Sequence, residues 1–108
     1  MDLTQKKCVP CEGGTPPLRN EEIEKYLSQL KTKWDVVEGR KIKKQFIFED
    51  FKKAIEFVNK VANIAEREQH HPDIHIFYSK VTIELWTHAI GGLSENDFII
   101  AAKIENLL

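Results

Sequence analysis

The chain of 108 residues carries 16 lysines and arginines against 17 aspartates and glutamates, which gives a formal net charge of −1. This length predicts one domain with a core that needs no disulfide or metal, and 42% hydrophobic residues argue against disorder. The balanced charge argues against nucleic acid or an anionic membrane surface as the main partner, and no run approaches the ~18 apolar residues of a membrane span.

Residues 1–19 are expected to form an extended arm, because glycine and proline recur and no hydrophobic period is present. Its start lacks the apolar run of a secretory signal, so we expect a cytoplasmic enzyme or binding module. Cys8 and Cys11 have the spacing of half a zinc site, but a structural zinc needs four ligands and no second cysteine pair exists. We assign the arm no metal or redox role and expect a single domain at residues 20–108.

The domain is predicted to begin with a helix that Asn20 caps and that ends near Lys33. Runs at 34–38 and 41–48 flank a glycine and predict a β-hairpin. A longer helix follows Asp50 and ends near residues 69–71, since Pro72 cannot continue it. Its predicted apolar stripe comprises Phe51, Ala54, Ile55, Val58, Val61, Ala62 and Ala65, with Phe57 and Ile64 on the flank.

A second hairpin is predicted from strands at 74–78 and 81–88. The last helix, which is largely apolar, begins at Ser94, and Asp97 has the spacing of a capping-box partner. The order helix, hairpin, helix, hairpin, helix predicts an α+β two-layer sandwich, with a four-stranded antiparallel sheet under three helices on one face. The wide apolar surface of the middle helix, together with the apolar last helix, predicts self-association.

The most unusual cluster is the run from Glu66 to Pro72, which contains His70 and His71. Glu66 and His70 are four residues apart and so are expected to share a helix face, whereas the proline turns His71 elsewhere. Two imidazoles with different orientations could serve proton transfer, because histidine titrates near neutral pH. The alternative is that His70 only binds the last carbonyls of the helix.

His88 is the second candidate, since it is expected to end a strand beside two glycines, where sites are often found; the alternative is a solvated surface histidine. Trp86 shares its strand face and could form the wall of a site for a flat ring or pack in an interface. Asp97 is explained by capping alone.

Several spacings together resemble the pterin-4a-carbinolamine dehydratase family. They are Glu66-x-x-x-His70-His71-Pro72, Tyr78, Thr87-His88 and Gly92-Leu93-Ser94-Glu95-x-Asp97, and the resemblance runs from about Leu18 to the C-terminus. It implies the same four-stranded sheet with three helices, and loss of water from a 4a-hydroxytetrahydropterin to give quinonoid dihydropterin. Such a reaction needs acid–base groups but no metal or redox cofactor.

By this resemblance His70, His71 and His88 line the pterin site, with His70 and His88 transferring protons and His71 holding the ring. Glu66 is expected to orient His70 or a ring N–H, and Asp97 to have a supporting role. Further supporting residues are Pro72, Trp86 and Thr87. The resemblance also implies a homodimer or homotetramer.

Two other functions are compatible with the sequence. A non-catalytic oligomeric scaffold or assembly module on the same fold would depend on apolar helix surfaces such as Phe57, Ile64 or Leu107. A weaker alternative makes the three histidines the ligands of an open metal site.

Overall fold

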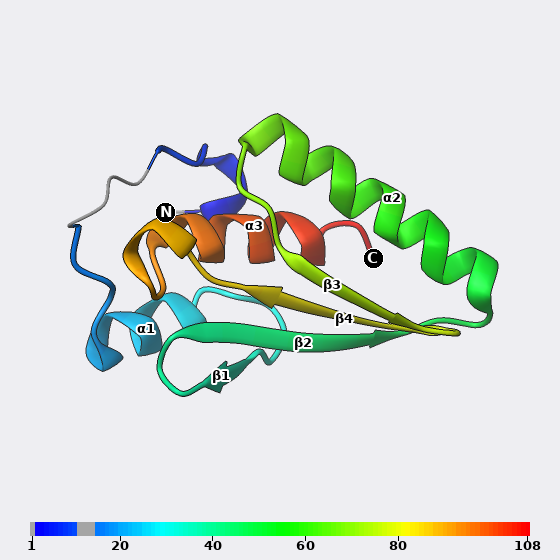
Figure 1. The fold of residues 1–108 in the computed structure, drawn as a ribbon, viewed down its shortest axis with the longest axis horizontal. Coiled ribbons are helices and arrows are strands. Elements are labelled where there is room, and N and C mark those ends of the chain that lie inside the picture. Colours follow the sequence, from blue (N-terminus) through cyan, green and yellow to red (C-terminus); the bar gives the residue numbers. More distant parts are fainter. Residues whose placement is uncertain (1, 11–14) are drawn as a thin grey trace.

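A four-stranded antiparallel sheet lies against a layer of α-helices in the computed structural model, which describes residues 2–10 and 15–108 (Figure 1). The strands are β1 (Asp35–Val37), β2 (Lys41–Ile47), β3 (Asp73–Phe77) and β4 (Lys80–Leu85), in the order β1-β2-β4-β3. The helices are α1 (Asn20–Leu27), α2 (Phe51–Glu68) and α3 (Glu95–Glu105), with short 3₁₀ helices η1 (Leu3–Gln5) and η2 (His88–Ile90). The predicted α+β fold is confirmed.

Local sequence signals placed most element boundaries. Arg40 N–H bonds Val37 C=O at 3.0 Å across a tight turn whose central residues, Glu38 and Gly39, have φ of 52° and 67°. The hairpin therefore turns at the glycine, as predicted. The carboxylate of Asp50 caps α2 by accepting the N–H of Lys53 at 2.8 Å.

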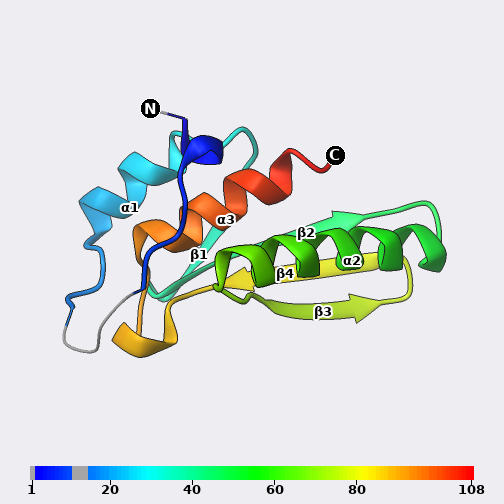
Figure 2. The ribbon, with the colours of Figure 1, turned by 90° about the horizontal axis from the view of Figure 1, so that it is seen from above.

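The core lies between the sheet and α2 and α3 (Figure 2). Val81, Ile83 and Leu85 of β4 are fully buried, which confirms the predicted alternation. The last helix, α3, is apolar because almost all of it is core: Phe98, Ile99, Ile100, Ala101, Ala102 and Ile104 are buried. Its apolar character is therefore satisfied within one chain.

The predicted stripe on α2 was partly wrong. Phe57 and Ile64, expected on the flank, are buried, whereas Ala62 is exposed and Phe51 is 51% exposed. The reason is that α2 packs against both β4 and α3, so its buried face is rotated toward α3. Phe57 also contacts the rings of Phe46 and Phe48, with centroids 4.9 and 4.8 Å away.

Two elements end earlier than predicted, the first beside a residue far away in sequence and the second at a local turn. Helix α1 ends at Leu27 rather than near Lys33, and the carboxylate of Glu105 accepts the N–H of Lys31 at 2.9 Å and that of Thr32 at 2.8 Å. Strand β4 ends at Leu85 rather than at residue 88, after which Thr87 pairs with Gly92 across the η2 turn.

The arm makes close contact with the domain. Asp2 caps η1 by accepting the N–H of Thr4 at 2.9 Å, and Leu3 is buried in the core against α3. The arm thus contains a helical turn where only extended chain was expected. Cys11 lies outside the described residues. Within the described part of the chain, no helix has the length and apolar character required to cross a bilayer.

Candidate active site

The end of α2 sets the direction of His70. The last helical residue is Glu68, and Gln69 has the left-handed conformation, with φ of 54°. The N–H of His70 then bonds back to the C=O of Ala65 at 3.2 Å, a common way of closing a helix. Because His70 has left the helix, its side chain does not share a helix face with Glu66.

His70 binds Asp97 instead. Its Nε2 lies 2.6 Å from Oδ1 of Asp97, a fully buried carboxylate in the first turn of α3, and the His70 side chain is only 12% exposed. The other carboxylate oxygen accepts the N–H of Ser94 at 3.0 Å, which confirms the predicted capping box, and the hydroxyl of Thr87 at 2.9 Å. Asp97 therefore both caps α3 and orients His70.

This arrangement selects the tautomer of a neutral His70. A carboxylate can only accept, so Nε2 must carry the proton that it donates to Asp97. Nδ1 then has a free lone pair and can take a proton. The buried carboxylate would stabilise the resulting imidazolium through a short charge-assisted hydrogen bond.

Glu66 pairs with the neighbouring histidine. Its Oε2 lies 2.6 Å from Nε2 of His71, and the two side chains are 74% and 55% exposed. Of the two roles expected for Glu66, orienting His70 is therefore wrong, and orienting a ring N–H of the pterin stays a prediction. The left-handed residue between them turns His70 toward α3 and leaves His71 beside Glu66.

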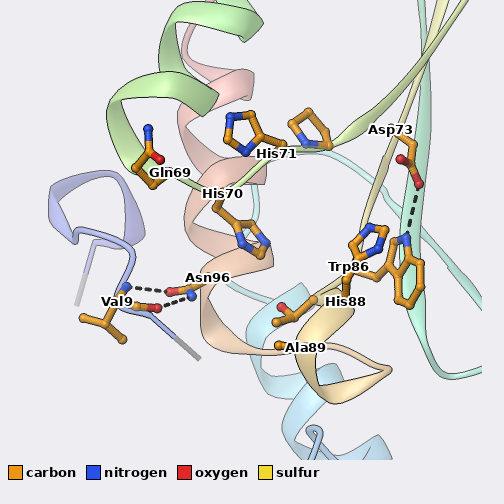
Figure 3. A pocket seen from close by; sticks show the side chains of 11 residues that line it. Val9, Gln69, His70, His71, Asp73, Trp86, His88, Ala89 and Asn96 are labelled. Atoms are coloured by element: carbon orange, nitrogen blue, oxygen red, sulfur yellow. Dashed lines mark hydrogen bonds between the residues drawn. The ribbon is translucent and has the colours of Figure 1, made fainter. Parts of the chain in front are cut away.

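Trp86 and His88 form the opposite side of the site. Their ring centroids are 3.9 Å apart with an interplanar angle of 31°, and the indole N–H of Trp86 donates to Asp73 at 3.2 Å (Figure 3). His88 is exposed and begins η2 rather than ending a strand. The indole is thus held against the edge of the sheet, next to His88.

One hollow of about 470 Å³ brings these residues together. Of the predicted residues, His70, His71, Pro72, Trp86, Thr87 and His88 line it, whereas Glu66 and Asp97 lie behind the histidines that they bind. Figure 3 shows the imidazole of His70 between Asn96 on one side and His88 on the other. Sequence reasoning missed five lining residues: Val9, Gln69, Asp73, Ala89 and Asn96. The two flanking the histidine motif, Gln69 and Asp73, could have been found from their position.

Among the described residues, no group of three or more His, Cys, Asp or Glu side chains is arranged to hold a metal ion. His70, His71 and His88 thus share a hollow without forming a cluster of metal ligands.

Glu68, the last residue of α2, is a buried carboxylate next to the site. It accepts hydrogen bonds from the ammonium of Lys103 at 2.8 Å and from the backbone N–H of Cys8 at 2.9 Å. Burial by itself raises the pKa of Glu68, but the hydrogen bonds from Lys103 and Cys8 outweigh it, so the pKa is lowered from its ordinary value. Glu68 is therefore a charged, fully engaged group at neutral pH.

The hollow is lined by three imidazoles, one of them bound to a carboxylate, and by an indole, and these groups are chemically suited to proton transfer and to contact with a flat ring. The family model described as Pterin 4 alpha carbinolamine dehydratase matches residues 16–107, and the chain belongs to this family of hydro-lyases.

Individual relatives agree with this assignment. A Rickettsia canadensis protein named "Putative pterin-4-alpha-carbinolamine dehydratase" is 52% identical over 104 residues, 96% of this chain and 95% of the relative. The crystal structure of a transcriptional coactivator/pterin dehydratase from Brucella melitensis has a TM-score of 0.78 at 34% identity and covers 84% of this chain and 97% of that chain. A pterin dehydratase-like protein identified as a RuBisCO assembly factor in the alpha-carboxysome shares the fold, with a TM-score of 0.61 at 23% identity over 71% of this chain and 90% of that one.

Proposed function

We propose that this protein removes water from 4a-hydroxytetrahydropterin to give quinonoid dihydropterin, by histidine acid–base catalysis, in tetrahydrobiopterin recycling. The observation that carries the proposal is the His70–Asp97 pair, whose imidazole lines one hollow with His71 and His88 in a chain of this family. A volume of about 470 Å³ is within the usual range for small-molecule sites.

The reaction requires two proton transfers. The hydroxyl group on C4a leaves as water and takes up a proton, while the N5 proton passes to a base as the C4a–N5 double bond forms. Positioned acid–base groups typically accelerate such steps ~10²–10⁴-fold, about 3–5 kcal/mol of barrier.

His70 is the proposed base. Asp97 holds its Nε2 and leaves Nδ1 to accept the N5 proton, and the carboxylate stabilises the charged ring that results. His88 is the proposed acid for the departing hydroxyl, and His71 holds the pterin. The face of Trp86 supports a flat ring, and the carboxylate of Asp73 can accept hydrogen bonds from the aminopyrimidinone edge of the pterin.

The test compares turnover of histidine variants with a matched control. His70→Ala and His88→Ala should each fold and lower the rate of carbinolamine dehydration by about a hundredfold. His75→Ala is the control, because His75 is an exposed histidine on β3 outside the hollow. Normal dehydration by both site variants would remove the mechanism and leave the scaffold hypothesis.

Self-association is proposed as well, through α2. Phe51, Ile55, Val58 and Ala62 follow one line on this helix, and each is exposed or only partly buried. A second copy of the chain is the proposed occupant, since the family resemblance implies a homodimer or homotetramer. Phe51→Lys should shift the protein to monomer in light scattering, and an unchanged mass would reject this surface. Phe57 and Ile64 cannot serve in such tests, because both are buried in the core.

A further inference from the structure

The N-terminal arm crosses the site at the place where two helix ends meet. Figures 1 and 2 show the dark blue segment after η1 passing both the end of α2 and the start of α3. These two helix ends supply the His70–Asp97 pair: His70 follows α2 by two residues, and Asp97 lies in the first turn of α3. A segment that holds the end of α2 against the start of α3 therefore also holds His70 against Asp97.

The arm is bonded to the end of α2 through Glu68. The backbone N–H of Cys8 donates to Oε1 of Glu68 at 2.9 Å, and Lys103 of α3 donates to the other carboxylate oxygen at 2.8 Å. Glu68 is only 9% exposed. A buried carboxylate that accepts two such hydrogen bonds holds the arm against the end of α2, because charge-assisted hydrogen bonds are among the stronger ones.

The next residue of the arm is bonded to the start of α3 through Asn96. The amide oxygen of Asn96 accepts the N–H of Val9 at 3.0 Å, and its amide nitrogen donates to the C=O of Val9 at 2.6 Å. Asn96 is buried, 4% exposed, and directly precedes Asp97. Figure 3 shows this pair beside His70 and across from His88.

Further contacts hold the chain before and after residues 8 and 9. Lys6 pairs with Glu95 of α3 at 2.7 Å, and Leu3 is buried in the core. Closer to α1, the N–H of Leu18 donates to the C=O of Leu93 at 2.9 Å, and Leu93 lies between η2 and α3. The chain before α1 is thus attached near both His70 and His88.

We propose that residues 6–9 are a clamp that sets the distance between the end of α2 and the start of α3, with Asn96 and Glu68 as positioning residues for the His70–Asp97 pair. Val9, which the clamp presents to the hollow, closes the wall beside His70. This inference deepens the proposed dehydratase function and rests on it for the kinetic part of its test.

The physical basis is the sensitivity of a short hydrogen bond to small displacements. The His70–Asp97 contact of 2.6 Å joins two helices that are separate in sequence. A misplacement of about 1 Å at a catalytic group can lower the rate by as much as 10²-fold. Releasing the arm therefore slows proton transfer more than it weakens pterin binding, which also uses Trp86 and His71.

The experiment breaks the clamp separately at its two anchors in the full-length protein. Asn96→Ala and Glu68→Ala should each lower kcat by about 10- to 100-fold with a smaller change in KM. Glu68→Gln keeps an oxygen that can accept the Cys8 N–H, so it should recover most of the rate lost in Glu68→Ala. Asn106→Ala is the matched control, an exposed asparagine just after α3 whose amide oxygen accepts a hydrogen bond from the ammonium of Lys31.

A spectroscopic reading separates this inference from the proposed function. The imidazole NMR signals of His70, assigned with His70→Gln, should change in both alanine variants and not in Asn106→Ala. Folded variants with wild-type kcat and an unchanged His70 signal would overturn the clamp. If one of the two anchor variants, Asn96→Ala or Glu68→Ala, does not fold, the other is sufficient for this test. A wild-type protein without dehydratase activity would reject the function, while the His70 signal would still test the clamp.

Discussion

Replacing Asp97 by asparagine preserves the shape of the side chain but reverses one hydrogen bond. One oxygen of Asp97 accepts two donors, the N–H of Ser94 and the hydroxyl of Thr87, whereas the other faces Nε2 of His70. The amide oxygen of asparagine will take the first position, so its NH₂ group faces His70. His70 must then accept at Nε2, which moves its proton to Nδ1 and removes the proposed base.

The expected effects on stability and on rate differ in size. Two of the three hydrogen bonds of Asp97 are kept, and a charge-assisted bond of about 1.5–3 kcal/mol becomes a neutral one of about 1 kcal/mol. The free energy of unfolding should therefore fall by about 0.5–2 kcal/mol. Loss of the base should lower kcat ~10²–10⁴-fold, equivalent to about 3–5 kcal/mol.

The assay follows dehydration of a 4a-hydroxytetrahydropterin generated in situ by a pterin-dependent hydroxylase, and urea unfolding measures stability. Ser94→Ala is the control, because its side chain belongs to the same capping network but does not touch His70. It should lose about 1 kcal/mol of stability and keep its turnover. Asp97→Asn with a rate close to that of Ser94→Ala would show that Asp97 only caps α3.

Three further predictions concern the wall, the arm and acid stability. Trp86→Leu removes the ring that packs at a tilt against His88 and should raise KM about three- to tenfold; a fall in kcat at constant KM would contradict this. Gly92→Ala places a Cβ 2.7 Å from Pro17 and should lower the free energy of unfolding by about 1–3 kcal/mol in urea, whereas an unchanged midpoint would reject that contact. Because the pKa of Glu68 is lowered in the folded protein, its carboxylate stabilises the fold at pH values above 4.5, the pKa of the unfolded state, and this stabilisation is lost as the pH falls through the folded pKa. Glu68→Gln should therefore be less stable than wild type near neutral pH and nearly equal to it in strong acid. An equal difference in stability at both pH values would be evidence against this role.

The fold could be predicted largely because its signals are local. Asp50 and Ser94 begin their helices through contacts within three residues, and Pro72 stops α2 by its own geometry. Alternation in β4 predicted which side chains are buried, since a strand has a fixed period. These features depend on residues that are close together in the chain, so they can be predicted from the sequence.

The errors involve partners that are distant in sequence. Helix α1 ends early beside Glu105, which lies more than seventy residues away, and the buried face of α2 is rotated because α3 packs against it. Periodicity identifies an apolar stripe on a helix. It does not tell which part of a wide stripe is buried when the helix packs against both a sheet and a second helix.

Six of the predicted site residues line the hollow, but five lining residues were missed and the pairing of the carboxylates was not predicted. The three histidines were identified from the motif and do line one hollow, yet Glu66 was paired with the wrong histidine. The contact of His70 with Asp97 spans 27 residues and depends on the left-handed turn at Gln69, a conformation that glycine or asparagine would have indicated but glutamine does not. The contribution of Val9 depends on how the arm folds back, which no local pattern shows.

The central claim is that three imidazoles act together on one bound ring. A crystal structure of this protein with a dihydropterin tests it most directly. The account predicts the ring in the hollow against Trp86, with Nδ1 of His70 and the imidazole of His88 within hydrogen-bond distance of N5 and C4a substituents. A pterin bound elsewhere, or bound in the hollow with His70 turned away from it, would contradict the account.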